Sequence, residues 1–303
     1  MASWQARSVN LVVRKLLRRR SWGDENQLAQ RARRLFGTPA PLRPFYSRGV
    51  AITPVSDNGV RGEWLAPKDP LEGAILYMHG GGYVSCSPET HRPITGALAR
   101  LTKRRVFSLA YRLAPENKFP AAVDDVVAAY RWLIDKQSIS PERIALGGDS
   151  AGGGLALALL LTARDEDLTM PACAVFFSPW TDLTAGGVSV KENDGRCDMF
   201  TPENIHDFAN AYLGDASPLE PLASPAYSDL KGLPPLLFHV GSTELLLDDS
   251  RRVHVAVLEA GGSSRIEIID GVCHAWQMLG SLVPEARKSL EGAASFITEH
   301  LAD

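Results

Sequence analysis

From residue 74 onward, short apolar runs alternate with segments in which apolar residues recur at helical spacing. The apolar runs are expected to form buried strands at residues 74–78, 106–110, 144–146, 174–177, 236–240 and 265–269. The segments between them are expected to form helices at 93–102, 121–136, 154–164, 249–260 and 284–301. Because buried strands that alternate with helices pair in parallel, this pattern predicts an α/β fold with a mostly parallel central sheet and helices on both faces.

The chain before this alternation follows a different pattern. Two short alternating runs, at 50–55 and 62–66, flank the hairpin-type turn Asp57-Asn58-Gly59, so antiparallel pairing is expected there. Two helical patches precede the runs, at 8–20 and 25–36, and the second closes at Gly37 and a Pro-rich segment at 38–41. These opening residues are expected to form an accessory element ahead of the sheet.

The first helical patch is amphipathic and basic. Leu11, Val12 and Leu16 fall along one side of a helix, with Val13 and Leu17 beside them. Basic residues surround this apolar stripe: Arg7, Arg14, Lys15, Arg18, Arg19 and Arg20. Such a helix can anchor a protein at a membrane surface. It can also pack its apolar stripe on the body of the protein with its charges in solvent, and we favour this commoner arrangement.

The alternation of strands and helices breaks between Trp180 and Pro234. This segment carries polar and acidic residues at 191–198, a helix-like stretch at 202–213, and then three prolines in turn-like positions. A long insertion within a compact α/β domain is usually functional and often forms a lid. We therefore expect a lid in this part of the chain.

The composition excludes several classes of function. With 303 residues, of which 45% are hydrophobic and 22% charged, the chain is long enough for one large α/β domain with an elaboration. A net charge of −3 gives no general attraction to nucleic acid, and no zinc-finger or RNA-binding signature is present. We therefore expect no nucleic-acid partner.

Cysteine spacing and the N-terminus bear on the compartment. Cys86, Cys173, Cys197 and Cys273 show no C-x-x-C pairing, and no apolar run approaches the length needed to span a membrane. The apolar residues of the basic N-terminus are interrupted by charges, and no small-residue cleavage site follows them. These features predict a reduced, cytoplasmic protein whose mature chain starts near its first residue.

The candidate nucleophile lies in Gly148-Asp149-Ser150-Ala151-Gly152, between a predicted strand and a predicted helix. A serine on such a turn is held in a tight backbone with its hydroxyl exposed, while small neighbours let strand and helix approach closely. This is the nucleophile elbow pattern. Because Gly and Ser are common in ordinary turns, the five residues need support from elsewhere in the chain.

That support comes from the segments that follow other strands, because ligands of an open parallel sheet bind at the carboxyl ends of its strands. His274 follows the last predicted strand and is the candidate general base, which takes the Ser150 proton and returns it to the leaving group. Glu244 follows the preceding strand and is the favoured acid behind His274, with Asp248 as its rival. The order serine, acid, histidine is that of an α/β-hydrolase.

A glycine run follows the strand at 74–78. The backbone N–H groups of Gly81 and Gly82, with that of Ala151 after the nucleophile, are the candidate oxyanion hole, because glycine leaves room for close approach. His79, Gly80 and Asp149 are expected to support these loops. The run lacks the Lys-Ser/Thr of a P-loop and the GxGxxG spacing of a dinucleotide site, so no phosphate-bearing cofactor is expected.

With those residues placed, the chain resembles the hormone-sensitive-lipase-like family of α/β-hydrolases, the bacterial family IV esterases. Four motifs carry the resemblance, and each stands in the family's order: His79-Gly80-Gly81-Gly82-Tyr83, Tyr111-Arg112-Leu113-Ala114-Pro115-Glu116, Gly147-Gly148-Asp149-Ser150-Ala151-Gly152-Gly153 and Gly271-Val272-Cys273-His274-Ala275-Trp276. One departure concerns the acid. The family commonly has Asp-Pro-Leu where this chain has Glu244-Leu245-Leu246.

The resemblance implies an α/β-hydrolase domain at 48–183 and 227–303, with a helical cap formed by residues 1–47 and 184–226. It implies a serine carboxylesterase that hydrolyses short-chain acyl esters and uses no cofactor and no metal. A subgroup that includes proposed monoterpene lactone hydrolases is similar at residues 3–7 and 179–183, which keeps a lactone hydrolase with the same triad as an alternative. The family often pairs through an exposed edge strand, so the resemblance also allows a homodimer.

One alternative belongs to a different class. The chain can be a non-catalytic ligand-binding protein on a hydrolase scaffold, because fold does not fix function. We expect such a protein to have lost a member of the triad, whereas all three positions are filled here. An enzyme is therefore the favoured hypothesis, with a small ester or lactone as its partner.

Overall fold

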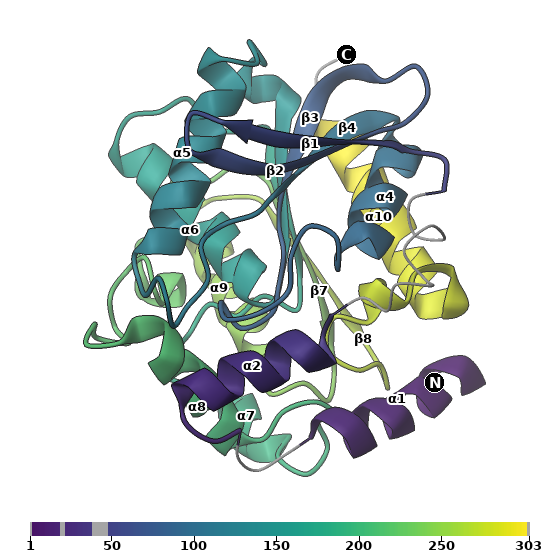
Figure 1. Ribbon diagram of the computed structural model, residues 1–303, viewed down its shortest axis with the longest axis vertical. Helices are drawn as coiled ribbons and strands as arrows, with labels where there is room; N and C mark the ends of the chain where they lie inside the picture. The colour runs from purple at the N-terminus through teal and green to yellow at the C-terminus, as the bar shows by residue number, and fades with distance from the viewer. Residues whose placement is uncertain (1, 19–21, 38–47, 302–303) are drawn as a thin grey trace.

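The computed structural model describes residues 2–18, 22–37 and 48–301, and this part of the chain folds around an eight-stranded sheet (Figure 1). The strand order is β1-β2-β4-β3-β5-β6-β7-β8. The pairs β1·β2 and β2·β4 are antiparallel, and the pairs from β4 through β8 are parallel. The bounds are β1 Ala51–Asp57, β2 Val60–Ala66, β3 Leu71–Met78, β4 Arg104–Leu109, β5 Ile144–Asp149, β6 Cys173–Phe177, β7 Leu236–Gly241 and β8 Ser264–Ile269.

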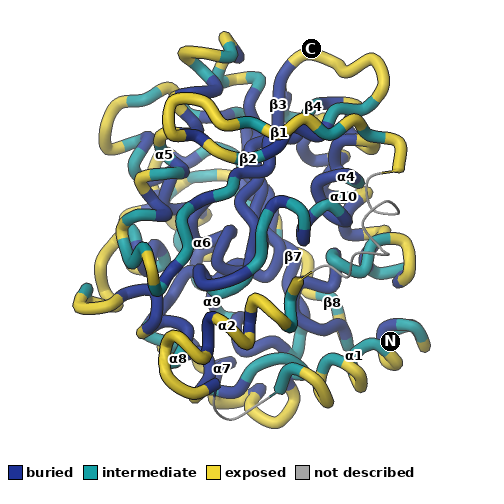
Figure 2. The backbone as a smooth tube through the Cα atoms, viewed as in Figure 1, coloured by how far each residue is buried: buried dark blue, intermediate teal, exposed yellow. Residues whose placement is uncertain are grey.

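Helices cover both faces of the sheet. Successive residues of β3 point to opposite faces, so Ile75 and Tyr77 join one buried cluster while Leu76 and Met78 join another. The first cluster lies under α4 (Arg92–Thr102) and α10 (Pro284–His300). The second lies under α5 (Ala121–Asp135), α6 (Ala151–Asp165) and α9 (Leu247–Glu259). The central strands β5, β6 and β7 are buried throughout, whereas the edge strands β1 and β8 are partly exposed (Figure 2). The predicted α/β class, with its parallel sheet covered on both faces, is confirmed.

The start of α6 differs from the prediction. The sequence pattern predicts that this helix begins at residue 154. In the structure α6 begins at Ala151, directly after Ser150, and the glycines form its first turn. Tight packing requires them there, because a Cβ at Gly153 would lie 2.6 Å from Pro179 and one at Gly154 would lie 2.3 Å from the Trp180 carbonyl. Tertiary contact therefore outweighs helix propensity at this turn.

Four helices gather at the end of the sheet where β7 and β8 finish (Figure 1). They are α1 (Trp4–Leu17), α2 (Glu25–Leu35), α7 (Val188–Glu192) and α8 (Pro202–Leu213). The predicted helix at 202–213 is confirmed with those bounds, and α2 packs against α8. The division into a cap and a catalytic domain stays a prediction. Residues 38–47, with the Pro-rich segment, and Arg19 and Arg20 lie outside the described residues.

The packing of α1 corrects a prediction. Ala6, Val9 and Val13 lie on the inner side of α1, in a cluster with Val272 and Trp276. The stripe that was expected to pack on the body faces outward instead, because its large apolar side chains are exposed: Leu11 is 70% exposed, Val12 56% and Leu16 49%. Ala6, Val9 and Val13 are small or β-branched and are spaced three and four apart, so they let α1 approach the body of the protein closely. The larger leucines are excluded from this contact.

None of the described helices combines the length and the apolar character needed to cross a bilayer.

Candidate active site

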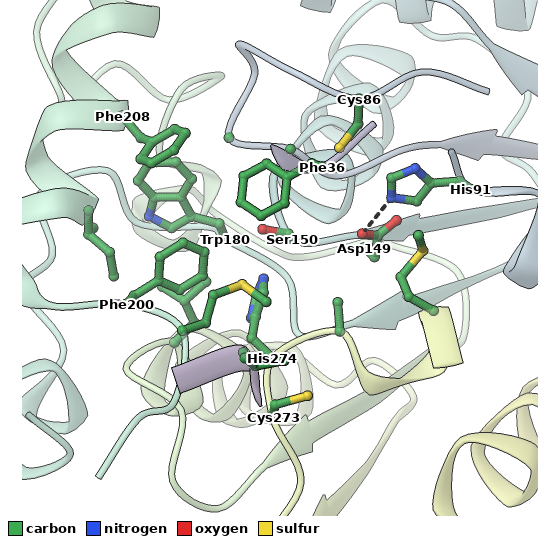
Figure 3. Close-up of a pocket in the computed structure, with 18 of the residues that line it drawn as sticks. Phe36, Cys86, His91, Asp149, Ser150, Trp180, Phe200, Phe208, Cys273 and His274 are labelled. Carbon is green, nitrogen blue, oxygen red and sulfur yellow. Dashed lines mark hydrogen bonds and ion pairs between the residues drawn. The ribbon is translucent and has the colours of Figure 1, made fainter. Parts of the chain in front are cut away.

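Ser150 stands between the last residue of β5 and the first residue of α6. Its backbone has φ 52° and ψ −123°, a conformation that costs strain in any residue other than glycine. Two hydrogen bonds fix it: Ser150 N–H donates to the Phe177 carbonyl at 2.9 Å, and the Ser150 carbonyl accepts from Trp180 N–H at 2.8 Å. The turn thereby presents the hydroxyl toward the cavity, as Figure 3 shows.

The glycines on either side of Ser150 permit this turn. A Cβ at Gly152 would lie 2.1 Å from the Met78 carbonyl oxygen, at the end of β3. A Cβ at Gly148 would lie 2.3 Å from the Gly152 carbonyl oxygen. Neither space accepts a side chain, so the two glycines let β3, β5 and α6 meet beneath the serine.

His274 follows β8 and is held by Glu244. Its Nδ1 lies 2.5 Å from Glu244 Oε2, and both side chains are buried. The other oxygen, Glu244 Oε1, accepts hydrogen bonds from Gly241 N–H at 2.6 Å and from the Ser178 hydroxyl at 2.7 Å. Because a carboxylate only accepts, the imidazole proton sits on Nδ1 and leaves Nε2 of the neutral ring as an acceptor.

The rival acid lies elsewhere. Asp248 Oδ2 accepts from Ser189 N–H at 2.8 Å, and its other oxygen lies 3.4 Å from Arg251. Asp249, one residue on, accepts from the N–H groups of Thr181 and Asp182. Both acids belong to the first turn of α9, where the positive end of the helix dipole stabilises negative charge. Of the acids after β7 that the sequence offered, only Glu244 forms a hydrogen bond with His274 among the described residues.

His274 Nε2 is buried and has no hydrogen-bond partner among the described residues. Figure 3 shows the ring below Ser150, with this edge toward the serine oxygen. Ser178 also holds the loop that carries His274, because its hydroxyl accepts a hydrogen bond from Ala275 N–H at 3.4 Å. A base with one nitrogen fixed by a carboxylate and the other left open toward a hydroxyl can accept and return a proton.

The glycine loop after β3 lies at the same cavity. Gly81 has φ 114° and Gly82 has φ 62°, and both line the cavity with Ser150. Within the described ranges, the N–H groups of Gly81, Gly82 and Ala151 donate no hydrogen bond. A Cβ at Gly82 would lie 2.3 Å from the Phe208 ring, so only glycine fits beneath α8. Three unengaged donors beside a hydroxyl are what an oxyanion hole needs.

Asp149 links the elbow to this loop. Asp149 Oδ1 accepts from the Tyr77 hydroxyl at 2.7 Å and from Gly80 N–H at 3.1 Å, and its Oδ2 lies 3.1 Å from His91 Nε2. Burial opposes ionisation of Asp149, but the charge and hydrogen bond of His91 and the hydrogen bond of Tyr77 outweigh it and lower its pKa. Asp149, which directly precedes the nucleophile, thus holds Gly80, which directly precedes Gly81.

His79 directly precedes the glycine loop. Its ring stacks on Tyr111 with centroids 4.3 Å apart, and Tyr111 donates its hydroxyl hydrogen to the His79 carbonyl at 2.7 Å. Burial lowers the pKa of His79 to about 3, so the ring stays neutral.

Sequence reasoning missed His91, Tyr77 and Ser178. They sit in a loop before α4, inside β3 and just after β6, and no local pattern marks them. The position of Ser178 directly after a strand was the one available signal.

The cavity beside Ser150 has a volume of about 200 Å³. Figure 3 shows Trp180, Phe200 and Phe208 on one side of Ser150, Cys86, His91 and Asp149 on the other, and Phe36 above it. Its lining comes from the sheet ends and from α1, α2 and α8: Val13, Phe36, Gly81, Gly82, Cys86, His91, Asp149, Ser150, Trp180, Met199, Phe200, Ile205, Phe208, Leu246, Cys273, His274, Ala275, Met278 and Leu279.

Two cysteines line this cavity, and both are free thiols. Burial raises the pKa of Cys86 and of Cys273 to about 12, so neither is a thiolate near neutral pH. Among the residues that the structure describes, no group of His, Cys, Asp and Glu side chains is arranged to hold a metal ion.

Comparisons with known proteins identify the family. Residues 75–278 match a family described as having the alpha/beta hydrolase fold. The chain is 43% identical to an acetyl-hydrolase of Streptomyces hygroscopicus over 78% of each chain, and 36% identical to an esterase of Acinetobacter venetianus over 82% of each. A solved esterase of the bacterial hormone-sensitive lipase family superposes over 100% of both chains with a TM-score of 0.90 and 36% identity. The crystal structure of EstE5 soaked with p-nitrophenyl butyrate gives the same score and coverage at 37% identity.

Proposed function

Because the chain belongs to the hormone-sensitive-lipase-like family of α/β-hydrolases and is a carboxylic ester hydrolase, we propose that it cleaves short-chain acyl esters through an acyl-enzyme at Ser150. The observation that carries the proposal is the state of His274: Nδ1 is fixed by Glu244 at 2.5 Å, and the buried Nε2 is left open beside Ser150. Such an imidazole is prepared to act on a hydroxyl.

In the proposed reaction, Ser150 Oγ attacks the ester carbonyl carbon while its proton passes to His274 Nε2. The carbonyl oxygen becomes an oxyanion that accepts hydrogen bonds from the N–H groups of Gly81, Gly82 and Ala151. Collapse of this intermediate breaks the bond to the alcohol, which leaves with the proton from His274. Water then attacks the acyl-Ser150 ester with His274 again as base, and the acid and free Ser150 are released.

Glu244 serves this cycle by charge and orientation. When His274 becomes an imidazolium, the carboxylate at Oε2 stabilises its positive charge and keeps Nε2 pointed at the serine. The two hydrogen bonds to Oε1, from Gly241 and Ser178, hold the carboxylate in place. The Glu244 side chain is one methylene longer than the Asp that is usual in the family. The hydrogen bond from Gly241 N–H to Oε1 holds this longer side chain in the position from which Oε2 contacts His274.

Short acyl chains suit the cavity. Its volume of about 200 Å³ is small for a lipid chain, and aromatic rings line one side of it. Related proteins point the same way: one relative is an acetyl-hydrolase, and another, from Pseudomonas putida and 31% identical, is an ethyl acetate hydrolase.

The test is a substrate panel with Ser150→Ala and a matched control, Ser281→Ala, at an exposed serine. We expect hydrolysis of p-nitrophenyl acetate and butyrate by the wild type and the control, and none by Ser150→Ala. Intact mass after a rapid acid quench is expected to show an acyl adduct on the wild type and on the control, and none on Ser150→Ala. Full activity of Ser150→Ala would contradict the proposal. Turnover of ε-lactones with no turnover of linear esters would point to the lactone hydrolase instead.

A further inference from the structure

The outer face of α1 exposes a set of large apolar side chains. Trp4 is 69% exposed and Leu11 70%, while Val12 and Leu16 are 56% and 49% exposed. In a helix of about 3.6 residues per turn, positions 4, 11 and 15 fall within about 40° of one another around the axis, and positions 12 and 16 lie about 80° and about 120° round from position 4. These four side chains and the basic residues among them are called the α1 outer face below.

The helix is held firmly by its other side. Ser3 donates from its N–H and its hydroxyl to the two oxygens of Glu285, at 2.6 Å and 2.8 Å. Asn10 donates to the Gly271 carbonyl at 3.0 Å, and Ala6 is buried at 2% exposure. Because the inner side is fully engaged, the exposure of the outer face is a stable feature of the fold.

The charges on α1 divide in the same way. Arg18 donates to the Cys197 and Phe200 carbonyls and pairs with Asp194 at 2.7 Å, and Arg14 donates to the Gly195 carbonyl at 2.9 Å. Those two arginines hold the loop before α8. Arg7 and Lys15 are exposed, and on the helix Lys15 lies between Leu11 and Val12. The outer face thus combines apolar side chains, a tryptophan and two cations.

We propose that the α1 outer face binds the surface of a lipid bilayer that carries anionic phospholipid. Leu11, Val12 and Leu16 enter the boundary between headgroups and acyl chains, and Trp4 lies at the headgroup level, where an indole is favoured. Arg7 and Lys15 meet the anionic headgroups, which attract basic residues next to a membrane.

Charge argues against a second copy of this chain as the occupant. In a two-fold contact the same face of both copies meets, which would gather Arg7 and Lys15 of both copies, four cations in all, in one interface. An anionic lipid surface has the opposite charge and no fixed shape, so it accommodates both the cations and the four apolar side chains.

Docking in this way brings the lipid next to the cavity. Val13 follows Val12 in the sequence, lies on the inner side of α1 and lines the cavity beside Ser150. The loop held by Arg18 carries Phe200, whose ring lies 5.0 Å from that of His274. A protein docked through α1 therefore holds its cavity close to the surface from which an apolar ester would leave the lipid.

The test is vesicle flotation, which needs no activity and so is independent of the proposed reaction. The vesicles are phosphatidylcholine alone and phosphatidylcholine mixed with phosphatidylglycerol. We expect the wild type to float with the mixed vesicles, less with phosphatidylcholine alone, and less at high salt because salt screens the headgroup charge. The double variants Trp4→Gln with Leu11→Gln, and Arg7→Gln with Lys15→Gln, are each expected to bind about tenfold more weakly or worse.

Matched controls remove the same groups elsewhere. Leu219→Gln with Leu258→Gln removes exposed apolar side chains, and Arg61→Gln with Lys136→Gln removes exposed cations, so both are expected to float like the wild type. Undiminished hydrolysis of a water-soluble ester by the α1 variants checks that they fold. Three results would overturn the proposal: no flotation of the wild type, equal flotation of the α1 variants, or a wild-type dimer that Trp4→Gln with Leu11→Gln separates.

Discussion

Glu244 Oε2 and His274 Nδ1 lie 2.5 Å apart, although 30 residues separate them in the sequence. Adjacent parallel strands, β7 and β8, end side by side and deliver the two residues to the same edge of the sheet. The carboxylate is fixed at both oxygens, by His274 at one and by Gly241 and Ser178 at the other. The pair is therefore rigid before any substrate arrives, which is what a preorganised base requires.

Replacing the acid tests its role. Glu244→Gln keeps the shape of the side chain but removes the charge that stabilises an imidazolium, so we expect kcat to fall by about a thousandfold or more. Asp248→Asn is the matched control, because Asp248 bonds to Ser189 and lies away from His274, and its kcat is expected to stay near that of the wild type. Steady-state kinetics on p-nitrophenyl butyrate measures both. The reverse ranking of the two variants would transfer the role to Asp248.

His91 is expected to position the oxyanion loop. It lies 3.1 Å from Asp149, which also binds Gly80, so its loss frees the loop that carries Gly81. His91→Leu should lower kcat by about tenfold to a hundredfold with little change in KM, because a misplaced donor acts on the transition state more than on substrate binding. His91→Gln keeps a donor and should recover part of the loss. A rise in KM at constant kcat would show that His91 contacts substrate instead.

Gly152 is expected to be indispensable to folding. A Cβ there would lie 2.1 Å from the Met78 carbonyl, so Gly152→Ala forces β3 and α6 apart and should cost about 3 kcal/mol of stability in urea unfolding. Gly292→Ala is the control within α10. Its nearest neighbour would be His239 at 3.6 Å, an ordinary contact, so alanine should add about 0.5–1 kcal/mol through helix propensity. Equal effects from the two changes would contradict this account.

Arg18 is expected to hold in place the loop that carries Phe200 into the lining of the cavity. It donates to the carbonyls of Cys197 and Phe200, and Phe200 lines the cavity. Arg18→Met keeps the apolar stem and removes these bonds, so the loop loosens and KM should rise by about tenfold while kcat changes little. Arg251→Met, at an exposed arginine of α9, should leave both constants unchanged. A fall in kcat alone would place Arg18 in the chemistry.

Acid is expected to destabilise the fold through buried histidines. Burial lowers the pKa of His239 to about 4, below its usual value of about 6.5 in an unfolded chain. Between these values the unfolded chain binds a proton that the folded chain does not, so stability is lost as the pH falls through this window. At pH 5 the loss from His239 should be about 2 kcal/mol relative to neutral pH.

Urea unfolding at pH 7 and pH 5 measures this effect. His239→Gln removes the titrating group and should make the loss between the two pH values smaller than in the wild type. His206→Gln, at an exposed position, should retain the full loss. Identical losses in the wild type and in His239→Gln would refute the assignment.

The order of apolar and polar residues along the chain is enough to predict the fold class and the chemistry available to the site. Buried runs such as 144–146 and 236–240 alternate with helical periods, and that alternation permits little besides a parallel sheet covered on both faces. Because such sheets bind ligands at the carboxyl ends of their strands, the order of strand ends already brought Ser150, His274 and the acids after β7 to one edge.

Which of these groups meet depends on how the folded chain packs. Glu244, Asp248 and Asp249 follow the same strand, and spacing along the chain does not fix side-chain direction; packing turns Glu244 toward His274 and the other two toward Ser189 and Thr181. The same holds for His91, which no local pattern marks because its partner Asp149 is 58 residues away. In α1 both stripes are apolar, and the choice of the smaller one for close packing left Leu11 and its neighbours in solvent. Periodicity reports which residues share a face, whereas contact depends on the shape of what lies opposite.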